Sequence, residues 1–261
     1  MGRGGVVLVD KEAGPSSFAV VRRVRARFGL KTGHGGTLDP FATGLLVCLV
    51  GRATRLARYQ SDLDKRYLVS IRLGVRTTTG DAEGRELERT PTASREEIER
   101  LRGEVELRVP AASAVKIAGE RAYRLHRRGV EVEMPFRRSV IHSLDVLVYE
   151  PPDVRLELRV SSGTYVRALA DALGGHCTGL RRTAVGHLRV EDADEERLLP
   201  PLTAVEHLRR RELTDEENVL VRSGRALPDE SAGRAALVHA GELVAVGSGD
   251  GRAIRPETVL A

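Results

Sequence analysis

The chain has few of the residues that mark secreted, metal-binding or membrane-spanning proteins. Its 261 residues include only two cysteines, Cys48 and Cys177, which cannot build a disulfide framework or a cysteine metal cluster. Its longest apolar run, residues 45–50, falls far short of the roughly 18 residues that a membrane helix needs. The N-terminus reaches Asp10 and Lys11 after one short apolar run, so no secretory signal is visible. We therefore expect a soluble protein of the cytoplasm.

Lysine is also scarce, because only four of the 42 cationic side chains are lysines and the rest are arginines. The net charge is +5, but residues 212–261 carry −4 and the preceding residues carry +9. A basic body is typical of nucleic-acid binding, since each arginine placed on a phosphate releases condensed counterions. The arginines gather in groups at Arg22, Arg23, Arg25 and Arg27, at Arg121, Arg124, Arg127 and Arg128, and at Arg137, Arg138, Arg181 and Arg182.

The apolar spacing of the N-terminal third predicts a strand, a helix, a loop and a second strand. The helix follows Ser16 and Ser17, which are good N-cap residues, and ends at Gly29. Residues 31–44 are rich in glycine and threonine and are expected to form a loop. The apolar residues 45–50 follow as a buried strand or the start of a helix.

The C-terminal half reads as strands with one further helix and a small β-rich tail. Thr164 is expected to cap a helix that runs to Leu173, and residues 180–188 are expected to form a strand. Residues 191–211 are charged and interrupted by prolines, which is typical of a domain junction.

The loop at residues 33–44 contains the most informative side chain, Asp39. Glycines allow the backbone to approach a ligand closely, and Pro40 keeps Asp39 out of helical geometry. A carboxylate held in such a loop is a candidate nucleophile or general base. Taken alone, an Asp-Pro step is more often only a turn. The loop lacks both the Gly-Lys-Ser/Thr of a phosphate-binding loop and the spacing of a dinucleotide fingerprint.

Residues 33–46 read GHGGTLDPFATGLL. This string resembles the catalytic motif of TruB-type tRNA pseudouridine-55 synthases, G-H-x-G-T-L-D-P-x-A-x-G-x-L. Other family motifs follow in the same order: VDKEAGPSS at 9–17, DKRY at 64–67, LGVRTTTGD at 73–81, SGTYVRALADALG at 162–174 and LRRTAVG at 180–186. One departure is Ala112, which stands where the family usually has a tyrosine before its RNA-gripping insertion.

The resemblance implies an isomerase that needs no cofactor or metal. The enzyme would flip one uridine out of its stack, break its C1′–N1 bond, and rejoin the base through C5. By resemblance Asp39 is the nucleophile or base, Tyr67 stacks on the uracil, and Arg167 is the cation that pairs with Asp39. Leu180 would cover the base, and His34 would fill the space that the flipped base leaves.

The resemblance also implies how the RNA is held. Lys11, Gly36 and Pro40 are expected to support the loop structurally. A basic insertion at about residues 110–138 is expected to grip RNA through Arg121, Arg124, Arg127 and Arg128. The implied partner is the T stem-loop of tRNA, and the protein is expected to act as a monomer without a required protein partner.

The implied architecture is α+β, a mixed and largely antiparallel sheet with flanking helices, as in the pseudouridine synthase fold. A catalytic domain is expected over residues 1–205 and a small PUA-like module over 212–261. Two alternatives remain open at this point. The protein could be a pseudouridine synthase for another RNA, within a guide-RNA particle, or an RNA chaperone of the same fold that folds tRNA by binding.

Overall fold

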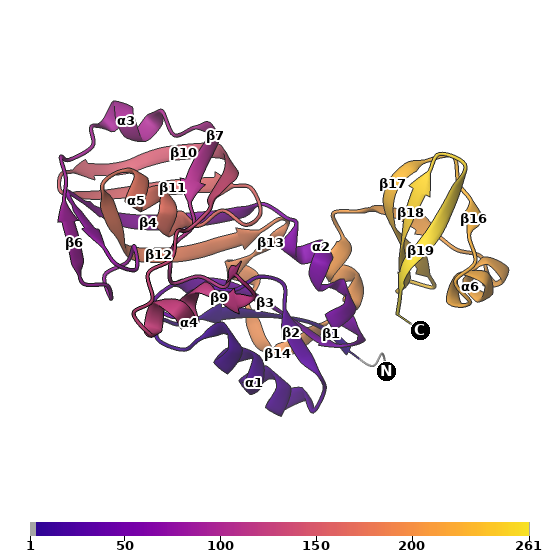
Figure 1. Cartoon of the computed structure of the whole chain (residues 1–261). Helices are drawn as coiled ribbons and strands as arrows, with labels where there is room; N and C mark the ends of the chain where they lie inside the picture. Colours follow the sequence, from indigo (N-terminus) through magenta and orange to yellow (C-terminus); the bar gives the residue numbers. More distant parts are fainter. Residues whose placement is uncertain (1–3, 261) are drawn as a thin grey trace. The chain divides into compact units, whose positions relative to one another are not determined.

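The computed structural model describes residues 4–260 and has the α+β architecture expected from the sequence (Figure 1). The chain gathers into two compact units. One unit combines the residues up to 63 with those from 184 onward, and the other comprises residues 64–183. The predicted division into a catalytic domain and a module stays a prediction. The C-terminal sheet of the module begins at Arg209.

The first unit begins with antiparallel strands whose two faces are both covered. β1 pairs with β3 without a break from Gly4 opposite Gly51 to Lys11 opposite Gly44. Nearly every residue of both strands is buried, which explains their continuous apolar sequence. The elements of this part are β1 (Gly4–Lys11), β2 (Thr32–His34), β3 (Thr43–Gly51), η1 (Arg52–Leu56), α2 (Ala57–Ser61), β13 (Leu188–Arg189), η2 (Val190–Asp192), β14 (Asp194–Leu199) and η3 (Pro201–Val205).

Helix α1 (Ser17–Phe28) forms as its sequence predicts. The Ser16 hydroxyl accepts the Ala19 N–H at 3.2 Å, and Gly29 closes the helix with a φ of 65°. The valines of the helix face inward. The prediction of a loop over residues 31–44 is wrong in part, because β2 pairs with residues 48–50 of β3. Backbone pairing with a neighbouring strand does not require apolar side chains, so their spacing gave no sign of β2.

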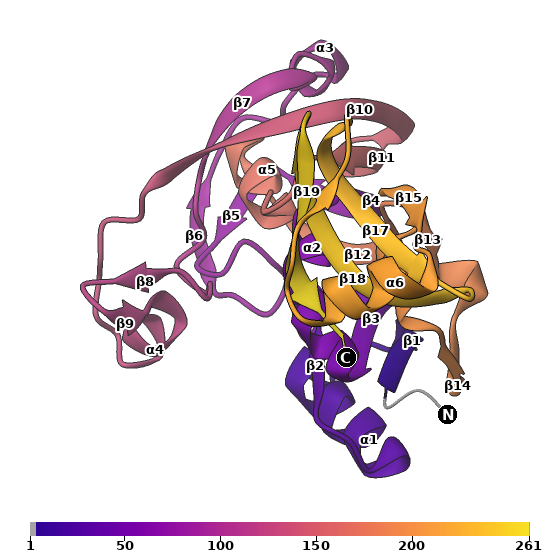
Figure 2. The ribbon, with the colours of Figure 1, turned by 90° about the vertical axis from the view of Figure 1, so that its right-hand side faces the viewer.

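The C-terminal module is a five-stranded sheet with one helix beside it (Figure 2). Its strand order is β15-β17-β18-β19-β16, and β15 runs parallel to β17. Within the first unit, Ala236, Val238 and Leu260 of the module share a core with Val6 and Leu8 of β1. The elements are β15 (Arg209–Glu212), α6 (Asp215–Arg222), β16 (Leu227–Pro228), β17 (Ala232–His239), β18 (Glu242–Asp250) and β19 (Ala253–Val259).

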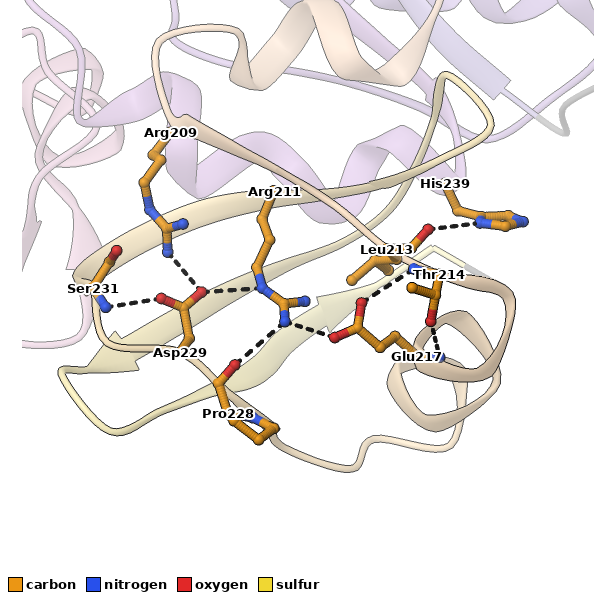
Figure 3. Close-up of polar contacts among 9 residues, drawn as sticks. All are labelled: Arg209, Arg211, Leu213, Thr214, Glu217, Pro228, Asp229, Ser231 and His239. Carbon is orange, nitrogen blue, oxygen red and sulfur yellow. Dashed lines mark hydrogen bonds and ion pairs between the residues drawn. The ribbon is translucent and has the colours of Figure 1, made fainter.

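A network of ion pairs joins β15, α6 and the segment after β16 (Figure 3). The Asp229 carboxylate, whose side chain is 5% exposed, lies 2.9 Å from Arg209 Nη2 and 3.2 Å from Arg211 Nε. Arg211 Nη2 also lies 2.8 Å from Glu217 Oε1. Glu217 closes a capping box with Thr214 at the start of α6. The arginines of β15 are therefore engaged inside the module.

The second unit is built on the strands β12-β4-β11-β10-β7, in which the last four pair antiparallel with their neighbours. β11 lies between β4 and β10 and pairs with both along its length. The elements are β4 (Lys65–Leu73), β5 (Val75–Thr77), β6 (Glu86–Arg89), α3 (Arg95–Glu99), β7 (Gly103–Arg108), β8 (Lys116–Ile117), β9 (Glu120–Arg121), α4 (Ala122–Arg127), β10 (Phe136–Glu150), β11 (Asp153–Val160), α5 (Val166–Ala172) and β12 (Gly175–Val185), which ends beyond the boundary of the unit.

Two sequence predictions in this unit are corrected by the structure. Tyr165, rather than Thr164, occupies the N-cap position of α5. The Thr164 hydroxyl instead lies 3.2 Å from that of Ser161. β12 begins at Gly175 rather than at Leu180. Gly174 and Gly175 follow α5 and mark its end in the sequence, so the strand was not expected to begin there.

Candidate functional site

Asp39 is held between two anchored neighbours in the loop that connects β2 to β3. The Ser17 hydroxyl donates to the Leu38 carbonyl at 2.7 Å and accepts the Leu38 N–H at 2.8 Å. The Pro40 carbonyl accepts the Gly14 N–H at 2.8 Å. The loop backbone is thus fixed on both sides of Asp39, whose side chain stays partly exposed.

Lys11 is completely buried beneath this loop. Its ammonium group donates to the carbonyl oxygens of Glu12 at 2.8 Å, Pro40 at 3.0 Å and Ala42 at 2.8 Å, which uses all three of its donors. Burial lowers the pKa of Lys11, while the negative charges of Asp39 and Glu12 oppose that shift. Lys11 therefore ties the loop to β1 and gives Asp39 a nearby positive charge.

In the glycine-rich stretch before Asp39, close packing requires a glycine at position 35. A Cβ on Gly35 would lie 2.5 Å from the Gln60 Cβ, and the Gly35 N–H donates to the Val47 carbonyl at 3.0 Å. His34 ends β2 and is partly exposed, and its Nδ1 accepts the Gly36 N–H at 3.3 Å. The loop thus brings together the predicted residues Lys11, His34, Gly36, Asp39 and Pro40.

Tyr67, Arg167 and Leu180 all belong to the second unit. Tyr67 lies on β4 opposite Leu158 of β11 and is 7% exposed. It shares a face of β4 with the buried residues Lys65 and Val69. Leu180 lies on β12 and is likewise almost buried.

Arg167 is a buried cation near the start of α5. Its guanidinium donates to the carbonyl oxygens of Thr79 at 2.5 Å and Ala112 at 3.0 Å. Its Nη1 also lies 3.4 Å from Asp81 Oδ2, and the two side chains are only 4% and 6% exposed. Gly80 has a φ of 73°, and a Cβ there would lie 3.3 Å from the Arg167 Cβ. The 79–81 turn therefore wraps closely around the arginine.

Asp81 is the functional candidate that the sequence argument did not identify. Its carboxylate accepts hydrogen bonds from the Thr79 hydroxyl at 2.6 Å and the Glu83 N–H at 3.1 Å. The backbone beside it is bridged to Cys177 of β12. The motif LGVRTTTGD contains Asp81, but its spacing gives no sign that Arg167 is the partner.

The departure at Ala112 leaves this arrangement intact. The contact that Ala112 makes with Arg167 uses its carbonyl oxygen, which any residue type supplies. A cavity of about 170 Å³ lies beside Arg167 in the second unit, lined by residues 77–80, Arg108, Met134 and Asp171.

The four predicted RNA-binding arginines lie on or beside α4 and are all exposed. Arg124 and Arg127 lie over the Tyr123 ring, with guanidinium carbons 5.9 Å and 5.6 Å from its centre. Arg128 instead pairs with Glu120 at 2.8 Å, and Arg121 donates to the Ala114 carbonyl. Within residues 4–260, two of these arginines thus have no ion pair and the other two have a partner.

None of the helices in residues 4–260 has the length and apolar character of a bilayer-spanning segment.

Comparisons with known proteins agree with these observations. Residues 22–166 match the family described as TruB family pseudouridylate synthase (N terminal domain). A protein of Mycobacterium sp. (strain KMS) named tRNA pseudouridine synthase B is 44% identical, over 86% of this chain and 84% of its own. One of the same name from Aromatoleum aromaticum is 39% identical, over 95% and 89%.

Solved structures share the fold. A chain from the crystal structure of a Cbf5-Nop10-Gar1 complex superposes with a TM-score of 0.73 at 25% identity, covering 99% of this chain and 85% of its own. A chain from an H/ACA RNP bound to a substrate RNA containing 2'-deoxyuridine has the same TM-score at 23% identity, covering 98% and 85%.

Proposed function

The chain belongs to the TruB family of pseudouridylate synthases, and on that premise we propose that it converts the T-loop uridine 55 of tRNA to pseudouridine. The protein is an isomerase: the C1′–N1 bond of the uridine breaks, the base turns, and a C1′–C5 bond forms. The observation that carries the proposal is the loop of residues 33–44, which holds one carboxylate rigidly while leaving it partly exposed.

Asp39 is the catalytic carboxylate of this proposal, acting as nucleophile at C1′ or as the base that generates a glycal. Its loop is fixed through Leu38 and Pro40, so little ordering is left to be done when the uridine arrives. Lys11 lies buried beneath the loop, and the negative charge of Asp39 opposes the lowering of the Lys11 pKa by burial.

Tyr67, Arg167 and Leu180 are proposed to contact the flipped uridine, and His34 to fill the space that the base leaves. The phenol ring of Tyr67 supplies a stacking surface, and its hydroxyl is suited to moving a proton at C5. The Arg167 guanidinium is always charged and is held in one place by the carbonyls of Thr79 and Ala112, which suits it to pair with a carboxylate.

The partner is tRNA, gripped by the insertion that carries Arg121, Arg124, Arg127 and Arg128. We propose further that the protein works as a monomer in the cytoplasm, without a protein partner. The 39–47% identity to bacterial relatives named tRNA pseudouridine synthase B favours this over action within a guide-RNA particle. Purified protein alone should convert an unmodified tRNA transcript and should elute as a monomer.

An Asp39→Asn variant tests the assignment of the catalytic residue. The amide keeps the shape of the side chain but cannot act as nucleophile or base, so pseudouridine formation should be abolished while tRNA affinity stays within a few-fold. The readouts are pseudouridine content of the transcript and filter-binding affinity.

Glu12→Gln is the matched control, because Glu12 is 71% exposed and also raises the pKa of Lys11. This variant should keep parental activity. Turnover of Asp39→Asn within tenfold of the parent would remove Asp39 from the reaction. Tight tRNA binding by a parent protein that forms no pseudouridine would favour the chaperone alternative instead.

A further inference from the structure

Helix α1 carries four arginines and no acidic residue. The proposed catalytic roles do not use any of them. The helix is twelve residues long, reads SFAVVRRVRARF, and buries its valines against the rest of the first unit. Its arginines project from the sides of the helix that the valines leave open, so their surroundings decide what they can bind.

The two sides of α1 differ in how their charge is compensated. Arg23 lies 2.6 Å from Glu195 Oε1 of β14 and also donates to Glu195 Oε2 at 3.0 Å. Arg27 lies 2.8 Å from Glu196 Oε1. The arginines that face β14 are therefore neutralised by carboxylates of that strand.

Arg22 and Arg25 lie on the opposite side and form no ion pair with any residue in the described range 4–260. Helical spacing places Phe18, Arg22 and Arg25 on one face, because the three are separated by four and three positions. Phe18 is 67% exposed, and the Arg22 guanidinium carbon lies 5.5 Å from the centre of its ring. We call these three residues the Phe18 face.

We propose that the Phe18 face binds the RNA substrate, with the phenyl ring stacked on an unpaired base and the two arginines on adjacent phosphates. The inference deepens the proposed function and rests on it. An aromatic ring with arginines beside it is suited to bind single-stranded nucleic acid. Every base can stack on the ring, and every phosphate can pair with an arginine. The chain has only nine aromatic residues, so an exposed one in this setting is notable.

The position of α1 fits this role. The helix packs beside β2, as both views show, and β2 leads directly into the loop that holds Asp39 (Figures 1 and 2). Lys31 is exposed in the connection between α1 and β2 and adds one more cation. RNA on the Phe18 face would therefore lie on the same unit as the catalytic loop.

A membrane surface is a poorer match for this helix. Binding in a bilayer interface uses the apolar face of an amphipathic helix, and the apolar face of α1 is covered by protein through Val20, Val21 and Val24. A single exposed phenyl ring remains. The successive phosphates of a nucleic-acid backbone are a better match than a bilayer surface for the two arginines of the Phe18 face.

The test compares variants of the two sides of α1 over a salt series with an unmodified tRNA transcript. Arg22→Gln with Arg25→Gln should flatten the plot of log K against log salt by about 1.4–1.8 units, from roughly 0.7–0.9 per phosphate contact. The control, Arg23→Gln with Glu195→Gln, also removes one arginine of α1 but leaves the net charge unchanged. Its slope should stay within about 0.5 units of the parent.

Phe18 is tested separately from the charge. Phe18→Leu should weaken tRNA binding about fivefold, the lower end of what stacking on one base contributes, while Phe18→Tyr should bind like the parent because it keeps the ring. Thermal unfolding of each variant should match the parent, since all three side chains of the Phe18 face are exposed.

An unchanged slope in the Arg22/Arg25 variant, an equal loss in the control, or equal affinity of the leucine and tyrosine variants would overturn the inference. Binding to vesicles of anionic lipid that depends on Arg22 and Arg25, with tRNA affinity unchanged, would overturn it as well. Failure of the proposed function is a distinct result, because it appears as absent pseudouridine formation in the parent protein and not as a change in affinity.

Discussion

The arginines of the insertion at residues 110–138 and those of the C-terminal module have opposite surroundings. In the module, Arg209 and Arg211 converge on the nearly buried Asp229, and Arg211 also pairs with Glu217 (Figure 3). In the insertion, Arg124 and Arg127 stand exposed over the Tyr123 ring, without an ion pair to any residue from 4 to 260. The first arrangement holds a small sheet together, and the second leaves charge available to a ligand.

The difference shows that a count of arginines does not locate an RNA-binding surface. Exposed ion pairs are worth little to stability, but each one cancels the charge that a phosphate would otherwise meet. Helix α1 contains both cases within twelve residues, since Glu195 and Glu196 neutralise one side only. The net charge of −4 over residues 212–261 also indicates that the module's arginines are not available to RNA, because the module has enough carboxylates to engage them.

Arg167 is a third case, a buried arginine whose partner is a buried carboxylate, and breaking that pair should have the largest effect. Asp81→Asn removes the carboxylate charge that lies 3.4 Å from the buried guanidinium, a change that costs about 3–5 kcal/mol in buried pairs. If only part of this free energy is lost from the stabilisation that Arg167 gives the transition state, the rate should fall about 100-fold or more. Single-turnover conversion of a tRNA transcript measures the loss.

Asp81 acts through Arg167 in this argument, so it is a positioning residue. Its variant should therefore keep tRNA affinity within a few-fold while the rate falls, and Asp81→Glu should restore part of the rate. Equal losses in the Asn and Glu variants, both explained by unfolding in a thermal melt, would show that Asp81 only supports the fold.

The residues around Asp39 show what the sequence could predict. The cap at Ser16 and the stop at Gly29 depend on near neighbours in the chain, and their predictions are confirmed. For residues 45–50 the sequence left a strand and a helix start open, and the structure shows the strand. The family resemblance is confirmed as well. The roles assigned to individual site residues stay predictions.

The partner of Arg167 shows where the sequence argument stops. Asp81 lies 86 positions before Arg167, and the two meet only through the tertiary packing of the 79–81 turn against α5. No local pattern encodes such a contact. The strand β2 was missed for the same reason, because its pairing with β3 is made by backbone groups that carry no mark in the side chains.

Breaking the module's network should affect stability rather than activity. Asp229→Asn removes the carboxylate that Arg209 and Arg211 share, while Arg211 keeps its pair with Glu217, and the free energy of unfolding should fall by about 1.5–3 kcal/mol, the range for hydrogen bonds to a charged group. The control is Glu212→Gln on β15, whose pair with Arg210 is exposed and should contribute less than about 1 kcal/mol. Thermal unfolding and hydrogen exchange of the module amides measure both.

The same network predicts a pH dependence. Burial raises the pKa of Asp229, but hydrogen bonds from Arg209 and the Ser231 N–H outweigh burial and hold the pKa below its ordinary value. A depressed pKa in the folded state contributes stability above the unfolded value of about 3.9 and loses it as the pH falls through the folded pKa. The gap between parent and Asp229→Asn should therefore narrow below about pH 4. A constant gap down to acid unfolding would contradict the ionic origin of the effect.

Within the insertion, the contrast between free and paired arginines predicts unequal effects on tRNA binding. Arg124→Gln should flatten the salt dependence of log K by about 0.7–0.9 units, as expected for one phosphate contact. Arg128→Gln should change the slope less, because Glu120 already lies 2.8 Å from that guanidinium. Identical slopes for the two variants would mean that the pair with Glu120 opens when RNA binds.

Removing Glu120 should sharpen the comparison by converting a paired arginine into a free one. The pair is largely exposed, with side chains 58% and 34% accessible, so it is worth about 0.2–1 kcal/mol and its loss should leave the fold unchanged. Glu120→Gln should then strengthen tRNA binding at low salt by about 1.5- to 5-fold, because Arg128 becomes available and a repelling carboxylate is gone. Combining it with Arg128→Gln should remove most of the gain. If Glu120→Gln strengthens binding equally with or without Arg128, the carboxylate acts on the RNA directly, and Arg128 is not part of the grip.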